Sequence, residues 1–157
     1  MDGLERFVQA QADSYARALR EIKSGRKTSH WMWYIFPQLS GLGHSQTARY
    51  YAIRDRAEAE AYLAHPVLGK RLLEISSELL KLESSDATAV MGWPDDLKLK
   101  SSMTLFSLVS REPVFRQVLE KYFRGEEDVY TVQVISRQAD DVTVPFSRSD
   151  GIIQEVR

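Results

Sequence analysis

Residues 30–36 constrain the fold of this chain more than any other segment. Four aromatic residues, a histidine and a methionine fall within these seven positions. Each large aromatic side chain buries about 150–250 Å², so the segment must form core or the wall of a pocket. If it is helical it has no polar face and is buried, and Pro37 ends it. Trp31 and Trp33 then face different ways, so at most one of them lines any one pocket.

Composition excludes several classes of protein. The 157 residues are expected to form one domain. A net charge of −1 argues against a protein that mainly coats nucleic acid or anionic membrane, although it allows a local basic patch. The chain has no cysteine, and its three histidines lack metal-type spacing, so we expect no disulfide, metal or cofactor. No signal peptide or membrane-length apolar run is recognised, which predicts a cytoplasmic protein. The sequence does not predict its oligomeric state.

Hydrophobic spacing and capping signals predict a mainly α, single-domain multi-helix bundle around a central buried helix. We expect a helical domain over residues 1–137 and a polar C-terminal tail over 138–157. Residues 128–136 are rich in β-branched side chains and allow a strand, but their context favours a last helix. The other expected helices run from Leu4 to Gly25, from Ser45 through Ile53, from Asp55 through Leu63, from Pro66 through Leu82, from Asp86 to Met91, from Pro94 through Leu108, and from Pro113 through Phe123 to Gly125.

Polar residues on an apolar helix face are candidates for function. Gln11 lies in the middle of the apolar stripe of the first helix, and Tyr15 follows one turn later. A buried amide must find partners. Gln11 therefore either bonds a neighbouring backbone group and joins two helices, or points with Tyr15 into a pocket. Glu5 flanks the same stripe with Gln9 beyond it, and an acid there is favourable near a helix N-terminus.

The helix after Pro94 is apolar around nearly its whole circumference, which is typical of a central helix. Lys98 nevertheless projects from it. This lysine either extends to solvent beside Asp95 or Asp96, or is partly desolvated and more nucleophilic. Asp95 and Asp96 are themselves explained as first-turn acids that meet the helix dipole.

A glycine-containing loop precedes Ser45. Because the loop opens a helix, Gly41, Gly43 and Ser45 could present backbone N–H groups to a phosphate, with Arg49 one turn further on. The alternative is a tight connector capped by Ser45. Among the nearby side chains, His30, Trp31 and Trp33 could stack on a purine or contact a sugar.

The chain from Leu4 to about Thr131 resembles the uncharacterised family called domain of unknown function eighteen-ten, some members of which are labelled calpastatin-like. That family is similar, more distantly, to the NADAR proteins, which are mainly helical and associated with ADP-ribose and NAD metabolism, including removal of ADP-ribose from modified guanine. The matching blocks are residues 4–11, 29–38, 41–43, 62–69 and 94–106.

The NADAR resemblance implies functional roles for Glu5 and Gln9 in the Glu-x-x-x-Gln-Ala-Gln pattern. The NADAR signature continues with a lysine where this chain has Ala12. If that lysine forms an imine with an opened ribose, then Lys98 substitutes from another helix or only binding is retained.

Two hypotheses follow. In the first, the protein binds or hydrolyses an ADP-ribose-type N-glycoside, and nucleic acid enters only as a substrate of the enzyme. The Gly41–Ser45 loop and Arg49 then hold the diphosphate, Trp31 or Trp33 stacks on the base, Glu5 is the acid/base, and Lys98 is a nucleophile or charge stabiliser. In the second, the protein is a non-catalytic helical module that binds another protein.

Overall fold

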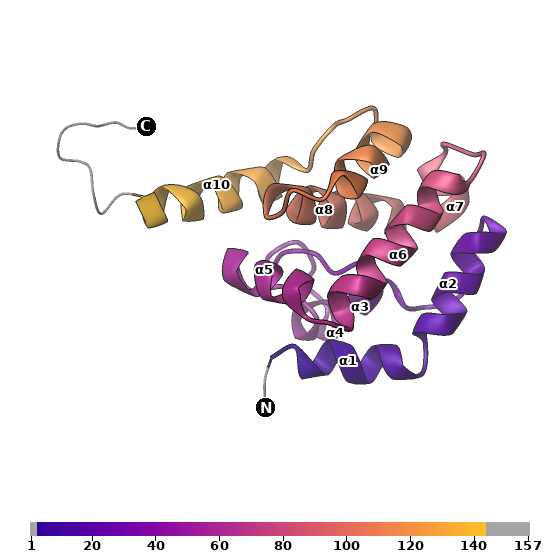
Figure 1. Cartoon of the computed structure of the whole chain (residues 1–157), viewed down its shortest axis with the longest axis horizontal. Coiled ribbons are helices and arrows are strands. Elements are labelled where there is room, and N and C mark those ends of the chain that lie inside the picture. The colour runs from indigo at the N-terminus through magenta and orange to yellow at the C-terminus, as the bar shows by residue number, and fades with distance from the viewer. Residues whose placement is uncertain (1–2, 144–157) are drawn as a thin grey trace.

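The computed structural model describes residues 3–143, with side chains up to residue 138. Within this range the chain is mainly helical, and the helices are joined by turns and loops (Figure 1). An isolated parallel bridge also joins Leu39 to Ile53. The helices are α1 (Glu5–Ala12), α2 (Tyr15–Ser24), α3 (Met32–Ile35), α4 (Gln46–Tyr50), α5 (Arg56–Ala64), α6 (Leu68–Lys81), α7 (Ala87–Met91), α8 (Asp95–Leu108), α9 (Pro113–Phe123) and α10 (Val129–Thr143). The predicted mainly α class is confirmed.

The long first helix expected from the sequence is two helices, so that prediction was wrong. α1 ends at Ala12, and α2 leaves it at a sharp angle (Figure 1). The hydroxyl of Ser14 donates to the carbonyl of Ala10 at 2.8 Å, and the Ser14 N–H donates to Gln11 at 3.2 Å. Serine offers the backbone such local alternatives to regular helix bonds. The break lets α1 contact α3 while α2 contacts α6.

Local signals located most helix starts correctly. Ser45, Asp55 and Asp86 each accept a hydrogen bond from a backbone N–H three residues later, at 2.9–3.1 Å. α4 is shorter than predicted, because it ends at Tyr50 rather than including Ile53. Ile53 instead exchanges backbone hydrogen bonds with the segment around Leu39.

Helix α8 is the central helix that the sequence predicted. It contacts α5, α7, α9 and α10. Its buried side chains include hydroxyls as well as apolar groups, and those of Ser101 and Thr104 donate to carbonyls one turn earlier, at 3.2 and 2.8 Å. The hydroxyl of Ser102 is buried without a hydrogen-bond partner. The buried apolar residues of α8 are Leu99, Met103, Leu105 and Phe106.

The aromatic segment is buried in part. α3 is a single short turn, in which Met32 and Ile35 are buried. Trp31 is 1% exposed and its indole N–H donates to the Glu21 carboxylate at 2.9 Å, so Trp31 belongs to the core. Trp33 is half-buried. The expected division of the two tryptophans between core and surface is confirmed.

The last predicted helix is also confirmed, with a different end. α10 continues past Arg137, where the sequence suggested a tail, to Thr143. Residues 144–157 of the predicted tail lie outside the described residues. No helix within residues 3–143 is long and apolar enough to cross a membrane.

Candidate functional site

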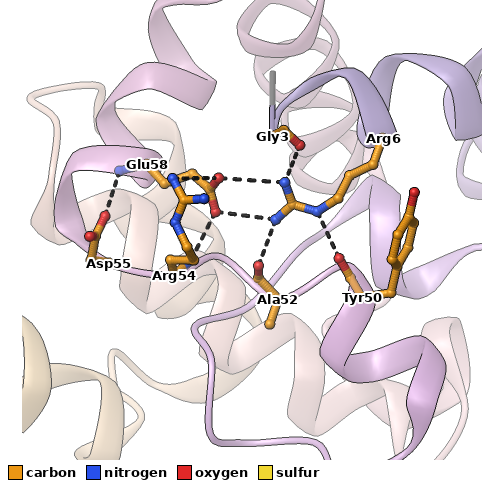
Figure 2. Close-up of polar contacts among 7 residues, drawn as sticks. All are labelled: Gly3, Arg6, Tyr50, Ala52, Arg54, Asp55 and Glu58. Atoms are coloured by element: carbon orange, nitrogen blue, oxygen red, sulfur yellow. Dashed lines mark hydrogen bonds and ion pairs between the residues drawn. The ribbon is translucent and has the colours of Figure 1, made fainter. Parts of the chain in front are cut away.

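Arg6 of α1 is surrounded by hydrogen-bond acceptors, all shown in Figure 2. Its guanidinium donates to the backbone oxygens of Gly3, Tyr50 and Ala52, the last two at 2.7 Å. It also pairs with the Glu58 carboxylate at 3.2 Å. Buried ion pairs are tolerated where additional hydrogen bonds satisfy the remaining donors, as here. This network fixes α1 against the α4–α5 connection.

The Arg6 network holds a group of aromatic rings in place. Tyr51 follows the Tyr50 carbonyl that Arg6 binds, and its ring lies 5.9 Å from Phe7 and 5.2 Å from Tyr34. The ring of Tyr50 meets that of Tyr51 edge-on at 4.8 Å. Aromatic pairs at these separations stabilise one another.

These rings open onto a hollow of about 500 Å³, which we call the aromatic hollow. No charged side chain lines it. Burial raises the pKa of Tyr51, and the neighbouring tyrosines raise it further, so its phenol stays neutral. The aromatic hollow therefore offers ring faces and neutral polar groups. Its lining residues are Trp33, Tyr34, Gln46, Thr47, Tyr50 and Tyr51.

A second hollow, of about 470 Å³, lies along the first turns of α8 and is called the Lys98 groove. It combines apolar walls with the two lysines of that helix. Asp128 lines it just before α10, and its carboxylate accepts from the Thr131 N–H at 3.0 Å and from the Thr131 hydroxyl at 2.6 Å. The groove is lined by Gln38, Leu42, Gly43, Pro94, Leu97, Lys98, Lys100, Ser101 and Asp128.

Lys98 and Trp33 connect the two hollows. The Lys98 Nζ lies 5.1 Å from the centre of the Trp33 ring, a cation–π contact. It also lies 3.5 Å from Asp95 Oδ1. The other oxygen of Asp95 pairs with Lys27 at 2.8 Å, and the Lys27 side chain is only 6% exposed. The Asp95 carboxylate is thus shared between two ammonium groups, those of Lys27 and Lys98.

The structure favours the plain interpretation of the acids of α8. Asp95 lies beside Lys98, as the pairing hypothesis predicted. Asp96 is buried, and its carboxylate accepts from the Thr88 hydroxyl at 2.6 Å and from the Leu97 N–H at 2.9 Å. Its oxygens are therefore used in joining α7 to α8.

The Gly41–Ser45 loop lies between the two hollows, since its neighbours line both. Gly41 has φ +104° and lies under Tyr130, whose hydroxyl donates to the Ser40 carbonyl at 3.0 Å. A side chain at Gly41 would clash with that ring. Ser45 is occupied as the cap of α4, a helix of five residues. Arg49 is exposed. These contacts fit a tight connector, and the phosphate-binding role stays a prediction.

Gln11 acts as a structural bridge. Its amide is 2% exposed and donates to the Tyr34 carbonyl at 2.7 Å and to the Tyr62 hydroxyl at 3.0 Å. Arg71 donates to its oxygen at 3.4 Å. The first of the two interpretations, an amide that joins helices through a backbone group, is confirmed. The Tyr15 hydroxyl lies 2.6 Å from Glu74, and burial together with this carboxylate raises the pKa of Tyr15.

The remaining predicted residues do not meet at the junction. Gln9 and His30 are exposed, and Glu5 is half-buried in the first turn of α1. None of these three lines either of the two hollows. Among the predicted site residues, the structure therefore brings Lys98 together with Trp33, Asp95 and Gly43, and leaves Glu5 outside the hollows.

The sequence analysis missed Tyr50 and Tyr51 as lining residues. The adjacent tyrosines end a short helix that Ser45 caps, which is a local signal. Their nearness to Trp33 depends on contacts between distant segments and has no such signal.

Two of the three comparisons with known proteins found a match. A family model described as protein of unknown function (DUF1810) matches residues 1–135. The crystal structure of the conserved hypothetical protein Rv1873 from Mycobacterium tuberculosis is 45% identical, with a TM-score of 0.83. The match covers 85% of this chain and 96% of that one. No curated protein matches the chain.

Proposed function

The chain belongs to the DUF1810 family of proteins of unknown function, and from the site described above we propose that it binds a nucleotide of the ADP-ribose class. The observation that carries this proposal is the position of the Lys98 ammonium over the Trp33 ring, where the aromatic hollow meets the Lys98 groove. The base stacks on Trp33 in the aromatic hollow, and the phosphates lie beside Lys98.

The dimensions and chemistry of the two hollows support this proposal. Volumes of about 500 and 470 Å³ fall within the range of small-molecule sites. A planar base stacks favourably on tryptophan or tyrosine. A phosphate beside Lys98 would satisfy an ammonium that shares its single carboxylate with Lys27. The aromatic hollow, which takes the base in this proposal, has no charged lining residue.

A reaction is the finer part of the proposal. Hydrolysis of an N-glycoside breaks the bond between the sugar C1′ and the base nitrogen; hydroxide from water joins C1′ and a proton joins the base. We propose that the Lys98 ammonium stabilises the negative charge that develops on the leaving base as the bond to C1′ breaks. Glu5 enters as the acid/base through the NADAR resemblance alone. Release of ADP-ribose from ADP-ribosylated guanosine tests this step, with Glu5→Gln expected to slow it and Arg111→Gln to leave it unchanged.

Isothermal titration calorimetry tests the binding itself. ADP-ribose should bind more tightly than either adenosine or ribose 5-phosphate, because only it occupies both hollows. Trp33→Ala and Lys98→Ala should each weaken binding by about tenfold or more, as expected for a stacked base and a charged hydrogen bond. Lys81→Ala is the matched control, since Lys81 is 70% exposed and pairs with Glu78 on α6. Equal binding by all variants, or none by the wild type, would refute the proposal.

A protein-interaction module is the second candidate, favoured by one observation. Trp93, in the turn before α8, and Leu97, in the first turn of that helix, expose 76% and 53% of their surfaces. Exposed tryptophan is typical of interaction hot spots. If this patch mediates self-association, light scattering will show an oligomer for the wild type and a monomer for Trp93→Ala. Nucleotides will then not change the thermal midpoint of the wild-type protein.

A further inference from the structure

We infer that the outer face of α2, together with Trp93, forms a binding surface for single-stranded nucleic acid. The face carries Arg17, Arg20 and Lys23, and Arg26 follows just beyond the helix. All four side chains are exposed. Within the part of the chain that the structure describes, their charged groups make no ion pair or side-chain hydrogen bond.

The geometry of α2 places these cations together. Arg17, Arg20 and Lys23 recur at three-residue intervals, so they share the side of the helix opposite the buried Ala18 and Ile22. Successive members are roughly 4.5 Å apart along the axis, at 1.5 Å per residue. The whole chain has a net charge of −1, so this positive charge is local rather than general.

The one acid on the same turns of α2 is directed away from this face. Glu21 accepts from the backbone N–H groups of Thr28 and Ser29, from the Ser29 hydroxyl and from the Trp31 indole. Burial opposes its ionisation, but these four hydrogen bonds outweigh it and lower the pKa of Glu21 to about 2. Its carboxylate is thus used in hydrogen bonds to residues 28–31 and forms no ion pair with the cations of α2.

The turn that carries Trp93 is joined to the segment that follows α2. Lys27 follows Arg26, its N–H donates to the Val90 carbonyl at 2.7 Å, and its ammonium pairs with Asp95 at 2.8 Å. Trp93 lies between Val90 and Asp95 in the sequence, and its side chain is 76% exposed. An indole this exposed makes no packing contribution that would explain it, whereas it presents a large ring face to a ligand.

The combination of cations and an exposed ring selects the partner. Proteins that bind single strands pair a positive track for the backbone with aromatic side chains on which bases stack. A duplex hides its base faces, and an anionic membrane needs an apolar helix face, which the exposed side of α2 lacks. Trp93 directly precedes Pro94, which lines the Lys98 groove together with Lys98. We therefore expect a strand bound at Trp93 to continue past this groove. Only this expected path of the strand rests on the proposed nucleotide site.

Fluorescence titration with an oligodeoxythymidine of about 15 nucleotides, near the upper end of known site sizes, tests the inference. We expect binding at low salt with quenching of tryptophan emission. Arg17→Gln/Arg20→Gln should weaken binding about tenfold and reduce the slope of log K against log salt by about 1.4, for two lost phosphate contacts. The matched control is Arg111→Gln/Arg137→Gln, which changes two exposed cations on other elements and should bind like the wild type.

Trp93→Ala separates stacking from charge and should weaken binding about tenfold while abolishing most of the quenching. Three results would overturn the inference. The first is no binding of the oligonucleotide at low salt, and the second is equal weakening of binding in the two double variants. The third is that heparin and anionic vesicles bind as tightly as the oligonucleotide and that Trp93→Ala has no effect on binding. If the wild type binds ADP-ribose but not the oligonucleotide, the proposed single-strand surface alone is refuted. If it binds the oligonucleotide but not ADP-ribose, the nucleotide site alone is refuted.

Discussion

Arg6 and Lys98, two of the cations that lie over aromatic rings, are held in very different ways. The Arg6 guanidinium lies 4.3 Å from the centre of the Phe7 ring. Its N–H groups donate to backbone oxygens and to the Glu58 carboxylate. Lys98 lies 5.1 Å from the Trp33 ring and has one carboxylate, which it shares. The first cation has no bonding capacity left for a ligand. The second lines the Lys98 groove beside the Trp33 ring of the aromatic hollow, and it retains bonding capacity for a ligand.

The comparison teaches how to separate structural from functional charge. An ion pair that is buried and fully hydrogen-bonded is expensive to break and unavailable to a ligand. A half-buried cation at the edge of a hollow contributes little to stability. The following predictions test that division, in order of decreasing effect.

The two largest effects, similar in size, are expected at Arg6 and at Trp31. Arg6→Ala leaves the Glu58 carboxylate, 3% exposed, without its buried partner, and should lower the free energy of unfolding by about 3–4 kcal/mol. Urea unfolding measures this. Arg54→Ala is the control, because Arg54 contacts the same carboxylate from a position 71% exposed and should cost under about 1 kcal/mol. Equal losses in the two variants would contradict the structural role of Arg6.

Substitution of Trp31 and of Trp33 should likewise change the free energy of unfolding by different amounts. Trp31→Ala removes a buried side chain and is expected to cost about 3–5 kcal/mol of unfolding free energy. Trp33→Ala removes a half-buried one and should cost roughly half as much or less. Denaturant titrations of both variants compare them. If Trp33→Ala destabilised the protein more than Trp31→Ala, the assignment of Trp31 to the core and Trp33 to the site would be reversed.

Glu21 gives the comparison a pH dependence. Its pKa is lowered to about 2 in the folded protein from 4.5, so its stabilising effect is complete above pH 4.5 and is lost as the pH falls toward 2. Glu21→Gln weakens the charged hydrogen bonds and should cost about 1–2 kcal/mol at pH 7. The difference between the two proteins should narrow from pH 5 to pH 2. A difference in unfolding free energy that is constant over this range would show that the carboxylate charge is not involved.

The smallest effect is expected at the cap of α4. Ser45→Ala removes the acceptor for the Ala48 N–H and should cost about 1 kcal/mol. Because α4 carries Gln46, Thr47 and Tyr50 of the aromatic hollow, the variant should also bind nucleotide more weakly. Ser45→Asp, which can also cap, should restore both properties. A variant that loses binding with no loss of stability would instead indicate direct contact of Ser45 with the ligand.

Helix starts could be predicted from the sequence because their signals are local. The caps at Ser45, Asp55 and Asp86, and the prolines before α8 and at the start of α9, act within three or four residues. The break after Ala12 could not, since the apolar spacing of α1 continues into α2 without interruption.

The site was predictable only in part for a related reason. Trp33 and Lys98 stand out by residue type on apolar faces, and both line a hollow. Tyr50 and Tyr51 reach Trp33 because Arg6 holds their backbone and because the bridge between Leu39 and Ile53 closes the intervening loop. Glu5 was placed by resemblance, and no contact of the described residues brings it to the hollows.

A thermal-shift comparison of four proteins with ADP-ribose tests the central claim most directly. At a hundred times its Kd, the ligand should stabilise the wild type by roughly 2.7 kcal/mol, a rise of about 5–10 °C in the midpoint. Arg54→Ala should show the same rise, while Lys98→Ala and Trp33→Ala show little or none. Equal rises in all four proteins, or no rise in the wild type, would contradict the claim that the junction of Trp33 and Lys98 is the binding site.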